Sequence, residues 1–322
     1  MPLRNARIAI TGASGFIGSH LARACVAEGA TVGCFIRNQT TAWRLTDILP
    51  QVTVFPADLE NASAVHDAIQ AFKPDIILHL AANTKRTRDL ALYERQHSAH
   101  VQTTLNLIRA ARELPGLARF VHTGTIEEYG RGDVPFQETQ REEPVTPYSL
   151  TKHEATRLTL YAAHEHAFPA TVLRLPPVYG PLQGKGMFIP DFIRAALTTG
   201  AFDMSPGEQT RDFLHVDDAV QAFLRAAEDR TSVGEIFNVG TGVETKLKDA
   251  ADLLRTIWGT DIQINRGAFP CDPHVETMRC VMRIDKIRGQ LGWSPRFALE
   301  DGLRRTVEWY KSSAHLYEHL WD

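Results

Sequence analysis

A glycine-rich turn close to the N-terminus restricts the possible folds of this chain more than any other feature. The apolar run Arg7–Thr11 leads into Gly12-Ala13-Ser14-Gly15-Phe16-Ile17-Gly18, and a helical pattern follows from Ser19 to Glu28. A strand, a glycine turn and a helix in this order are typical of the start of an α/β fold. The turn therefore predicts that the chain opens with the first strand of a parallel sheet.

The alternation of strands and helices continues after this turn and predicts a Rossmann-type, doubly wound parallel sheet. The apolar run Ile76–Leu80 fits a strand that is covered on both faces. Further strands are predicted at Thr31–Ile36, Val52–Phe55, Phe120–His122 and Thr171–Leu175, and helices at Ala62–Phe72, Leu90–Glu113 and Tyr148–His166.

After Pro176-Pro177 the chain becomes rich in glycine and proline, which indicates a second, smaller α/β lobe. We predict a dinucleotide-binding domain at 1–176, completed by parts of 212–258, and a substrate-binding lobe from 177–211 and 259–322. Helices are expected near Phe192–Leu197, Asp217–Ala227, Leu247–Trp258 and Leu303–Tyr310, and the tail from Asp261 onward is expected to mix short strands with that final helix.

Charge and cysteine usage exclude several classes of protein. A net charge of -3 gives no basic surface for nucleic acid, and the apolar runs are too short to span a membrane. The N-terminus lacks the pattern of a secretory signal, and the four cysteines form no Cys-x-x-Cys pair, so a cytoplasmic protein is expected. His164 and His166 lie in a polar helical stretch, and no metal site is predicted.

The glycine turn predicts a dinucleotide site. Gly12, Gly15 and Gly18 let the backbone approach a pyrophosphate, whose charge is met by free N–H groups and the helix dipole. An acid at the end of the second strand would bind the adenosine ribose, but this chain has Ile36 followed by Arg37, which favours NADP over NAD. Alternatively, Arg37 is a solvated loop cation.

Two further positions have alternative interpretations. Asp58-Leu59, after the third strand, is expected to line the adenine pocket, although Asp58 would equally suit a helix cap near Ala62. Tyr148 and Lys152 lie four residues apart, so a helix places both on one face. A lysine held near the phenol lowers its pKa and makes an acid/base group, while the alternative is a surface pair.

Several motifs together resemble those of the extended short-chain dehydrogenases/reductases, often called the NAD-dependent epimerase/dehydratase family, which act on nucleotide sugars. The resemblance runs from residue 7 to about Trp293. It rests on Thr11-Gly12-x-x-Gly15-Phe16-Ile17-Gly18, His79-Leu80-Ala81-Ala82, Thr125 with Tyr129-Gly130, Tyr148 to Lys152, Val178-Tyr179-Gly180-Pro181, and Arg211-Asp212-Phe213-Leu214-His215-Val216-Asp217-Asp218.

This resemblance implies an enzyme with Thr125, Tyr148 and Lys152 as catalytic residues. Thr125 would bind the sugar oxygen, Tyr148 would exchange its proton, and Lys152 would hold the nicotinamide ribose and stabilise the phenolate. Arg211 would bind the substrate's diphosphate, with an ion pair to Asp212 or Asp217 as the alternative. The resemblance also implies cofactor contacts from Phe16, Ile17, Ala81 and Ala82, and substrate contacts from Asn83, Thr125, Tyr179 and Gln183.

Three departures from the family pattern concern the substrate. His100 and Pro177 each stand where the family commonly has Asn. The late phosphate-binding arginine has three candidates, Arg266, Arg279 and Arg283.

The segment after Thr125 bears on the reaction. Glu127 matches a glutamate of the family's 4,6-dehydratases and decarboxylases, but Ile126 replaces the aspartate of the dTDP-glucose enzymes and cannot donate a proton. Because Arg37 favours NADP, an NADPH-dependent 4-ketoreductase of a 4-keto-6-deoxy nucleotide sugar is the favoured prediction. The alternatives are a 4-epimerase, 4,6-dehydratase or decarboxylase that recycles bound NAD(P), and a catalytically silent dinucleotide-binding module.

The resemblance finally implies a homodimer formed through the helices near 90–113 and 148–166. The sequence itself shows only that these helices are amphipathic, which burial within one chain would also explain.

Overall fold

A computed structural model describes residues 2–37, 39–259, 261–272 and 277–321. Its centre is a seven-stranded sheet with the order β11-β6-β5-β4-β1-β2-β3, in which every neighbouring pair is parallel. The predicted α/β fold with a Rossmann-type sheet is confirmed. The strands are β1 Arg7–Thr11, β2 Thr31–Ile36, β3 Val52–Pro56, β4 Ile76–His79, β5 Arg119–Thr125, β6 Ala170–Leu175 and β11 Ile236–Asn238.

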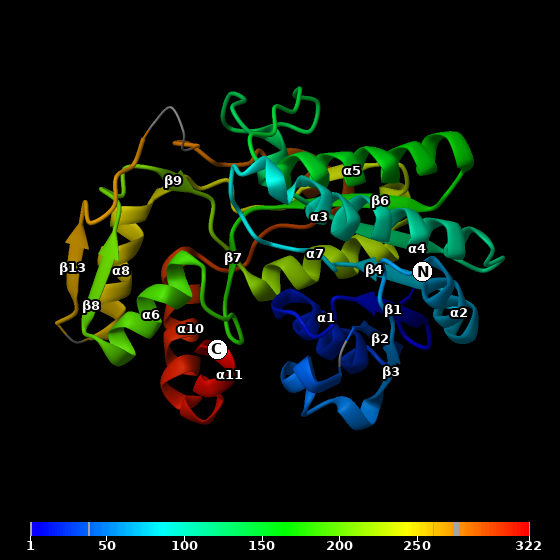
Figure 1. Ribbon diagram of the computed structural model, residues 1–322, viewed down its shortest axis with the longest axis horizontal. Helices are drawn as coiled ribbons and strands as arrows, with labels where there is room; N and C mark the ends of the chain where they lie inside the picture. Colours follow the sequence, from blue (N-terminus) through cyan, green and yellow to red (C-terminus); the bar gives the residue numbers. More distant parts are fainter. Residues whose placement is uncertain (1, 38, 260, 273–276, 322) are drawn as a thin grey trace.

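Helices cover both faces of this sheet (Figure 1). One face packs against α1 (Phe16–Ala27) and α7 (Val216–Glu228), and the other packs against α2 (Ala62–Phe72), α4 (Thr103–Arg112) and α5 (Pro147–His166). The register pairs Ile10 with Cys34 on one side and with Leu78 on the other, so the C-terminal ends of β1, β2 and β4 meet at one edge. This edge therefore carries the glycine turn.

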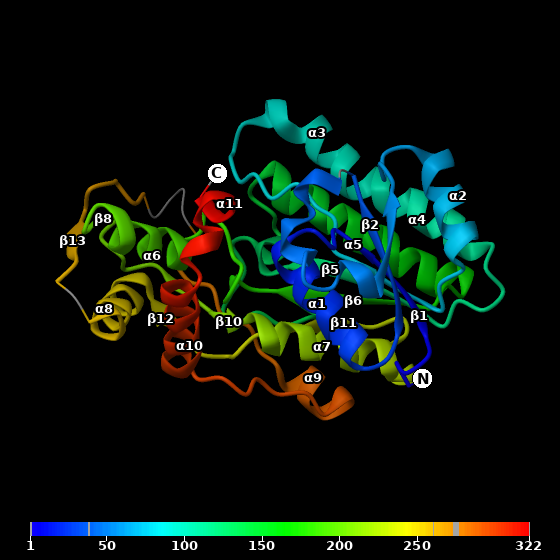
Figure 2. The same cartoon turned by 90° about the horizontal axis from the view of Figure 1, so that it is seen from below.

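A second group of elements lies beside the sheet, at the left of Figures 1 and 2. Its apolar core is shared by residues of α6, α8 and α10, including Phe192, Leu254 and Leu303. The elements are β8 Ala201–Met204 paired with β13 Gln263–Arg266, and α6 Phe188–Thr198, α8 Leu247–Trp258, α10 Leu299–Ser312 and α11 Tyr317–Trp321.

The exact division of the chain into two lobes stays a prediction. Residues of α9 (Asp285–Leu291), including Ile287 and Leu291, pack with the core on the α1 and α7 face of the sheet rather than with α6 and α8. Two short strand pairs are formed by segments that follow Pro176: β7 Val178–Tyr179 pairs with β10 Leu214–His215, and β9 Thr210–Arg211 pairs with β12 Thr245–Lys246.

The single helix expected at Leu90–Glu113 is interrupted. A short turn at Leu90–Leu92 precedes α3 (Tyr93–His97), and a π-helical segment at Ser98–Gln102 separates α3 from α4. The hydroxyl of Thr103 donates to the Ala99 carbonyl at 2.8 Å and that of Thr104 to the His100 carbonyl at 2.6 Å. Such side-chain bonds to the preceding turn compete with regular helix hydrogen bonds.

Helix ends also differ from the prediction, for reasons that lie in the caps. Helix α1 begins at Phe16 rather than Ser19 because Gly15 is already its cap. Helix α5 begins at Pro147, where Thr146 and Ser149 cap each other's backbone N–H groups. Within the described ranges, no helix combines the length and apolar character needed to cross a membrane.

Candidate active site

The glycine turn forms a close-packed cradle at the end of β1. Gly12 has φ 68°, and a Cβ there would lie 2.8 Å from the Ala81 nitrogen. A Cβ at Gly18 would lie 2.2 Å from the Gly12 carbonyl oxygen, so neither position accommodates a side chain. Gly15 caps α1 and has no side chain to bind the first N–H groups of that helix. Free N–H groups at the start of a helix suit a pyrophosphate, so the glycine turn stays the predicted dinucleotide site.

Hydrogen bonds fix the next strand end against this turn. The Thr11 hydroxyl oxygen accepts from the backbone N–H of Leu80 at 3.1 Å and from that of Ala81 at 3.2 Å. Ala81 is partly exposed and Ala82 is exposed, whereas Leu80 packs against the core. The two alanines predicted to contact a cofactor therefore lie at the surface of the same edge as the glycines.

The end of β2 bears a cation and no acid. Ile36 is 3% exposed and belongs to the core, whereas Arg37 is exposed directly after the strand. Asp58 is exposed and accepts from the Glu60 N–H at 3.1 Å, while Leu59 is buried. The alternative that Asp58 caps the next helix is wrong, because Asn61 occupies the cap of α2 and accepts from the Ala64 N–H.

The structure brings Thr125, Tyr148 and Lys152 together at the C-terminal end of β5. Thr125 is the last residue of β5, and Tyr148 and Lys152 lie one turn apart on α5. All three side chains are buried, and interaction with the Thr125 hydroxyl lowers the pKa of the Tyr148 phenol. The Lys152 ammonium donates to the Thr123 carbonyl of β5. The alternative of a surface Tyr–Lys pair is therefore wrong.

Burial dominates the electrostatics of this group. It raises the pKa of Tyr148 to about 12, although the positive charge of Arg86 and the Thr125 hydroxyl oppose the rise. Burial also lowers the pKa of Lys152 to about 8, against the opposing charge of Glu128. The expected lowering of the tyrosine pKa is thus not found, because burial outweighs the nearby charges and the Lys152 ammonium points to the Thr123 carbonyl.

Glu127 is held in an ion pair beside the phenol. The Arg86 Nε donates to Glu127 Oε1 at 2.5 Å, and the Arg86 guanidinium lies 4.8 Å from the centroid of the Tyr148 ring. The Glu127 side chain is 30% exposed, while Ile126 is 2% exposed and packs in the core. Glu127 is therefore a solvent-accessible carboxylate that is paired with the guanidinium of Arg86.

The neighbouring Glu128 has a structural role. Its Oε1 accepts from the Thr125 N–H at 2.8 Å and from the Thr156 hydroxyl at 3.1 Å, and its Oε2 accepts from Arg174 Nε at 2.9 Å. Glu128 and Arg174 are both fully buried, and Arg174 also pairs with Glu142 at 2.6 Å. This network fixes the backbone that carries Thr125 and Glu127.

His100, which stands where the family has Asn, anchors the segment after β4. His100 Nδ1 is hydrogen-bonded to the Thr151 hydroxyl at 2.8 Å. His100 Nε2 lies within hydrogen-bond distance of both the N–H of Asn83, at 3.1 Å, and the carbonyl of Asn83, at 3.0 Å. Burial lowers the pKa of His100 to about 3, which keeps the ring neutral. His100 thereby ties Asn83 to the helix that carries Tyr148.

Two residues predicted to bind substrate are buried instead. The Tyr179 hydroxyl donates to the Leu299 carbonyl at 3.4 Å, and its ring belongs to the core of α6, α8 and α10. Gln183 is 7% exposed, and its amide donates to the Val178 carbonyl at 2.9 Å. Asn83 is partly exposed, and its side-chain oxygen accepts from the Lys85 N–H. Of these three residues, only Asn83 lies next to the group around Tyr148.

Arg211 and Glu127 are both close enough to the Cys280 thiol to influence its pKa. Burial raises the pKa of the Cys280 thiol to about 12, and the thiol experiences both the positive charge of Arg211 and the negative charge of Glu127. Arg211 donates to the carbonyls of Thr210 at 2.7 Å and Thr277 at 3.0 Å. Asp212, proposed as its alternative partner, is buried and accepts from Thr241.

The three candidates for a late phosphate-binding arginine all pair with acids. Arg266 pairs with Asp252 at 2.5 Å, Arg279 with Glu244 at 2.7 Å and Arg283 with Asp285 at 3.2 Å. Each arginine side chain is about half exposed. These surface pairs give no preference among the candidates.

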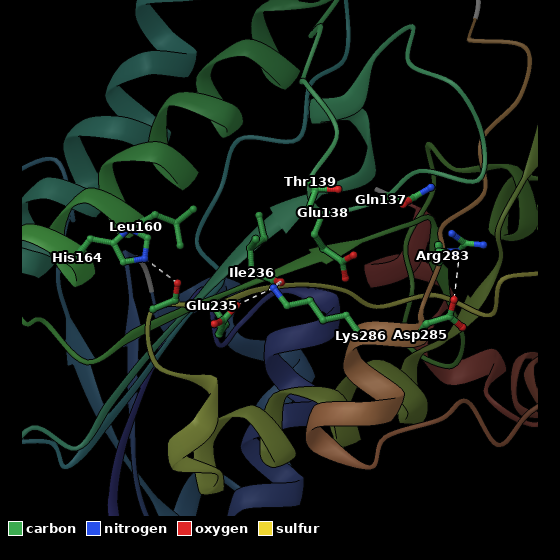
Figure 3. Close-up of a pocket in the computed structure, with 11 residues that line it drawn as sticks. Gln137, Glu138, Thr139, Leu160, His164, Glu235, Ile236, Arg283, Asp285 and Lys286 are labelled. Atoms are coloured by element: carbon green, nitrogen blue, oxygen red, sulfur yellow. Dashed lines mark hydrogen bonds and ion pairs between the residues drawn. The ribbon is translucent and has the colours of Figure 1, made fainter.

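A hollow of about 650 Å³ lies elsewhere, beside the edge strand β11 (Figure 3). Lys286 pairs with Glu235 at 2.7 Å across it, and His164 Nε2 is hydrogen-bonded to the Gly234 carbonyl at 2.9 Å. The residues that line it are Gln137, Glu138, Thr139, Leu160, His164, Gly234, Glu235, Ile236, Arg283, Asp285 and Lys286. None of them was predicted for catalysis or cofactor binding.

Sequence reasoning missed Arg86, whose guanidinium lies 4.8 Å from the centroid of the Tyr148 ring and pairs with Glu127. The only signal in the sequence is a cluster of positive residues at Lys85, Arg86 and Arg88 after the His79-Leu80-Ala81-Ala82 motif. Nothing in that cluster distinguishes the residue that turns inward. His100 was noticed as a departure, but its bonds to Thr151 and Asn83 depend on the π-helical segment that contains it.

Comparison with known proteins bears on the identity of this fold and site. Residues 8–240 match the model of the NAD dependent epimerase/dehydratase family. The human dTDP-D-glucose 4,6-dehydratase is 28% identical over 331 residues, which cover 98% of this chain and 92% of the relative. A UDP-N-acetyl-alpha-D-glucosaminuronate decarboxylase of Bacillus cytotoxicus is also 28% identical, over 95% of this chain and 98% of the relative.

Solved structures agree with this assignment. The UDP-glucose 4-epimerase of Thermotoga maritima, determined with UDP-glucose, superimposes with a TM-score of 0.87 at 26% identity and covers 95% of this chain and 99% of its own. The dTDP-glucose 4,6-dehydratase DesIV of Streptomyces venezuelae, determined with NAD, gives a TM-score of 0.87 at 26% identity over 98% of this chain and 99% of its own. The resemblance inferred from the motifs is confirmed, together with the prediction of an enzyme. The chain belongs to the NAD dependent epimerase/dehydratase family.

Proposed function

We propose that this enzyme is an NADPH-dependent 4-ketoreductase that acts on a 4-keto-6-deoxy nucleotide sugar. The Thr125, Tyr148 and Lys152 group provides one proton relay at one oxygen, which suits the reduction of a single carbonyl. The relatives named as nucleotide-sugar enzymes support the substrate class.

Each residue of the group has a defined part in this proposal. Thr125 and Tyr148 bind the sugar oxygen at C4, and Tyr148 delivers the proton that converts it to a hydroxyl. Lys152 holds the cofactor ribose, and its buried ammonium favours the phenolate once it turns from the Thr123 carbonyl. A nicotinamide dinucleotide, when bound at the glycine turn, supplies the hydride. Arg211 is the proposed anchor for the diphosphate.

The choice of reaction rests on Ile126 and Glu127, the two residues that follow Thr125 and that would have to supply a proton donor in a dehydratase. Loss of water from a sugar requires a proton donor for the departing hydroxyl, and general acids contribute about 10²–10⁴-fold to such steps. Ile126 is buried and apolar, and Glu127 Oε1 already accepts a hydrogen bond from Arg86 Nε at 2.5 Å. This arrangement supports reduction rather than elimination.

The choice of cofactor rests on the end of β2. Ile36 is buried and Arg37 is exposed, so an arginine fork is available for a 2'-phosphate while no carboxylate follows the strand to bind the ribose hydroxyls. A reductase must also take its hydride from an external pool, which NADPH provides.

A second candidate is an enzyme that returns the hydride to its own substrate, such as a 4-epimerase or a decarboxylase. The similarity to the decarboxylase of Bacillus cytotoxicus and to two solved 4-epimerases, from Thermotoga maritima and Bacillus cereus, favours it. Neither reaction needs an acid at position 126.

One experiment separates the two candidates. The purified protein is denatured, and the dinucleotide that it releases is identified by mass spectrometry. Tightly held NAD in an amount equal to the protein supports the recycling enzyme and contradicts the reductase. A protein that is purified largely without dinucleotide, and that binds added NADPH more tightly than NADH, supports the reductase.

We further propose a homodimer in the cytoplasm. Tyr161 on α5 is 56% exposed and Leu90, just before α3, is 76% exposed, so apolar surface is available on the helices expected to pair. A mass of two chains in solution is the expected result. The cysteines Cys25, Cys34 and Cys280 are buried free thiols, which suits a reducing compartment.

A further inference from the structure

Arg86 lies over the ring of Tyr148 although the two residues come from different parts of the fold. Arg86 belongs to the irregular segment after β4, and Tyr148 lies in the first turn of α5. The guanidinium carbon is 4.8 Å from the ring centroid, which is within the range of a cation–π contact. Arg86 is thus a cation beside the phenol in addition to Lys152.

Three further contacts hold Arg86 in this place. Its Nε donates to Glu127 Oε1 at 2.5 Å, and its Nη1 donates to the Thr84 carbonyl at 3.3 Å and lies 3.7 Å from the Met187 sulfur. Met187 caps α6 of the neighbouring lobe. The guanidinium therefore contacts the tyrosine ring, the Glu127 carboxylate and the N-cap residue of α6.

The ammonium of Lys152 is directed at a backbone carbonyl rather than at the phenol. Its ammonium donates to the Thr123 carbonyl within β5, and burial lowers its pKa to about 8. Near neutral pH the lysine is therefore closer to losing its charge than an exposed lysine is. An arginine keeps its charge at every pH at which the enzyme works.

We propose that Arg86 is a positioning residue for proton transfer, which favours the phenolate of Tyr148 and is itself held in place by Glu127. The proposal rests on the proposed function in one respect, namely that Tyr148 is the proton relay. It does not depend on which nucleotide sugar is bound or on the direction of the hydride.

The charges around Tyr148 have defined signs. Burial raises the pKa of the phenol to about 12, Arg86 lowers it, and the carboxylates of Glu127 and Glu128 raise it. His100 packs against the ring at 5.5 Å between centroids and is neutral, because burial lowers its pKa to about 3. The charged or titratable groups that face Tyr148 are therefore Arg86, Glu127, Glu128, His100 and Lys152.

The size of the effect follows from distance and exposure. An opposite charge within 4–6 Å shifts a pKa by about 1–3 units. The Arg86 side chain is 39% exposed, so solvent screens part of its charge, and we expect a shift at the lower end, about one pH unit.

The first test compares Arg86→Gln, Arg86→Lys and Lys85→Gln. Lys85 is an exposed cation in the same segment, so its variant loses the same charge away from the ring. We expect the limb of the pH profile of kcat that reports ionisation of Tyr148 to move up by about one pH unit in R86Q. It should stay close to the wild-type position in R86K and K85Q, and the fall in kcat of R86Q should exceed any change in KM.

Glu127→Gln provides a change of opposite sign. It removes a carboxylate that raises the pKa of Tyr148, so the same limb should move to lower pH. A limb that stays in place in both R86Q and E127Q, or that moves down in R86Q, overturns the proposal. A fall in kcat without any shift of the limb would show that Arg86 only supports the fold.

A second measurement needs no turnover and so separates this proposal from the proposed function. Fluorotyrosine incorporated at position 148 lowers the intrinsic pKa of the phenol, and its fluorine resonance, assigned with Tyr148→Phe, reports the titration directly. The midpoint should lie higher in R86Q and lower in E127Q than in the otherwise unchanged protein. Equal titration midpoints in the three proteins would overturn the role of Arg86 even if the reductase activity is found. A higher midpoint in R86Q and a lower one in E127Q would support that role even if the activity is absent.

Discussion

The imidazole rings of His79 and His122 lie 5.4 Å apart in the buried layer between the sheet and helices α4 and α5. His79 is hydrogen-bonded to the hydroxyls of Thr11 at 2.7 Å and Thr104 at 3.1 Å. Among the described residues, neither ring nitrogen of His122 has a hydrogen-bond partner. Burial and the charge of Lys152 lower the pKa of both rings, that of His79 to about 3.

These histidines should make stability sensitive to acid. The unfolded chain takes up protons below the ordinary pKa of 6.5, whereas the folded protein keeps His79 and His100 neutral down to about pH 3. The contribution of these neutral rings to the free energy of unfolding is therefore fully present above about pH 6.5, and it is lost as the pH falls toward 3. Each such ring contributes about 1.4 kcal/mol per pH unit to this loss. Urea unfolding between neutral pH and pH 4 measures it.

His122→Leu tests the contribution of the ring without partners. The slope of the free energy of unfolding against pH below neutral should then correspond to about one proton fewer than in the wild type. Because no hydrogen bond is lost, the free energy of unfolding at neutral pH should be unchanged or raised by about 1 kcal/mol. His315→Leu, which changes an exposed histidine, is the control. An acid slope for H122L equal to that of the wild type would contradict the assignment of a buried neutral ring.

Tyr148→Phe should abolish turnover while cofactor affinity stays within about twofold of the wild type. The phenol is the only proton donor proposed for the sugar oxygen, and such groups contribute about 10²–10⁴-fold. Tyr161→Phe removes an exposed hydroxyl from the same helix and is the matched control. Activity that survives in Y148F would show that the proton comes from another group.

Glu127→Gln distinguishes reduction from elimination. In a ketoreductase Glu127 transfers no proton to the substrate and only influences Arg86 and Tyr148, so kcat near neutral pH should fall by less than about tenfold. In an enzyme that eliminates water, Glu127 would be the proton donor, and kcat should fall by about 10²-fold or more. Steady-state kinetics of wild type and E127Q decide between these outcomes.

Arg37→Gln should weaken NADPH binding by about 10- to 150-fold and leave NADH binding nearly unchanged, since a hydrogen bond to a charged group contributes about 1.5–3 kcal/mol. Arg4→Gln, an exposed arginine near the start of β1, controls for overall charge. Fluorescence titration with both cofactors gives the two dissociation constants. An equal effect of R37Q on both cofactors would contradict contact with a 2'-phosphate.

Much of the fold was predictable because local signals and tertiary demands agree. The apolar strands and the glycine turn predicted the sheet, and the spacing of Tyr148 and Lys152 predicted a shared helix face. The region after Asp261 was predicted less well. Its helices α9 and α11 are each shorter than two full turns, and α9 is stabilised by packing of Ile287 and Leu291 on a core formed elsewhere in the chain.

The site was predictable where motifs carry it and not where contacts between distant segments do. Arg86 approaches Tyr148 only because His100 and Asn83 fix the segment after β4 against α5. Tyr179 lies within a matching motif, yet its ring is buried against Gly302, where a Cβ would lie 2.1 Å from the tyrosine oxygen. Packing of α10, which no motif indicates, decides that outcome.

The most direct test of the proposed reduction is an assay of NADPH oxidation by the purified enzyme with 4-keto-6-deoxy nucleotide sugars. We expect oxidation of one NADPH for each 4-hydroxy product formed, with NADH less effective and with no oxidation by Y148F. The contradicting result is no NADPH oxidation with any such sugar, together with conversion of a saturated nucleotide sugar without added cofactor. That outcome would make the enzyme an epimerase, dehydratase or decarboxylase that recycles its own hydride.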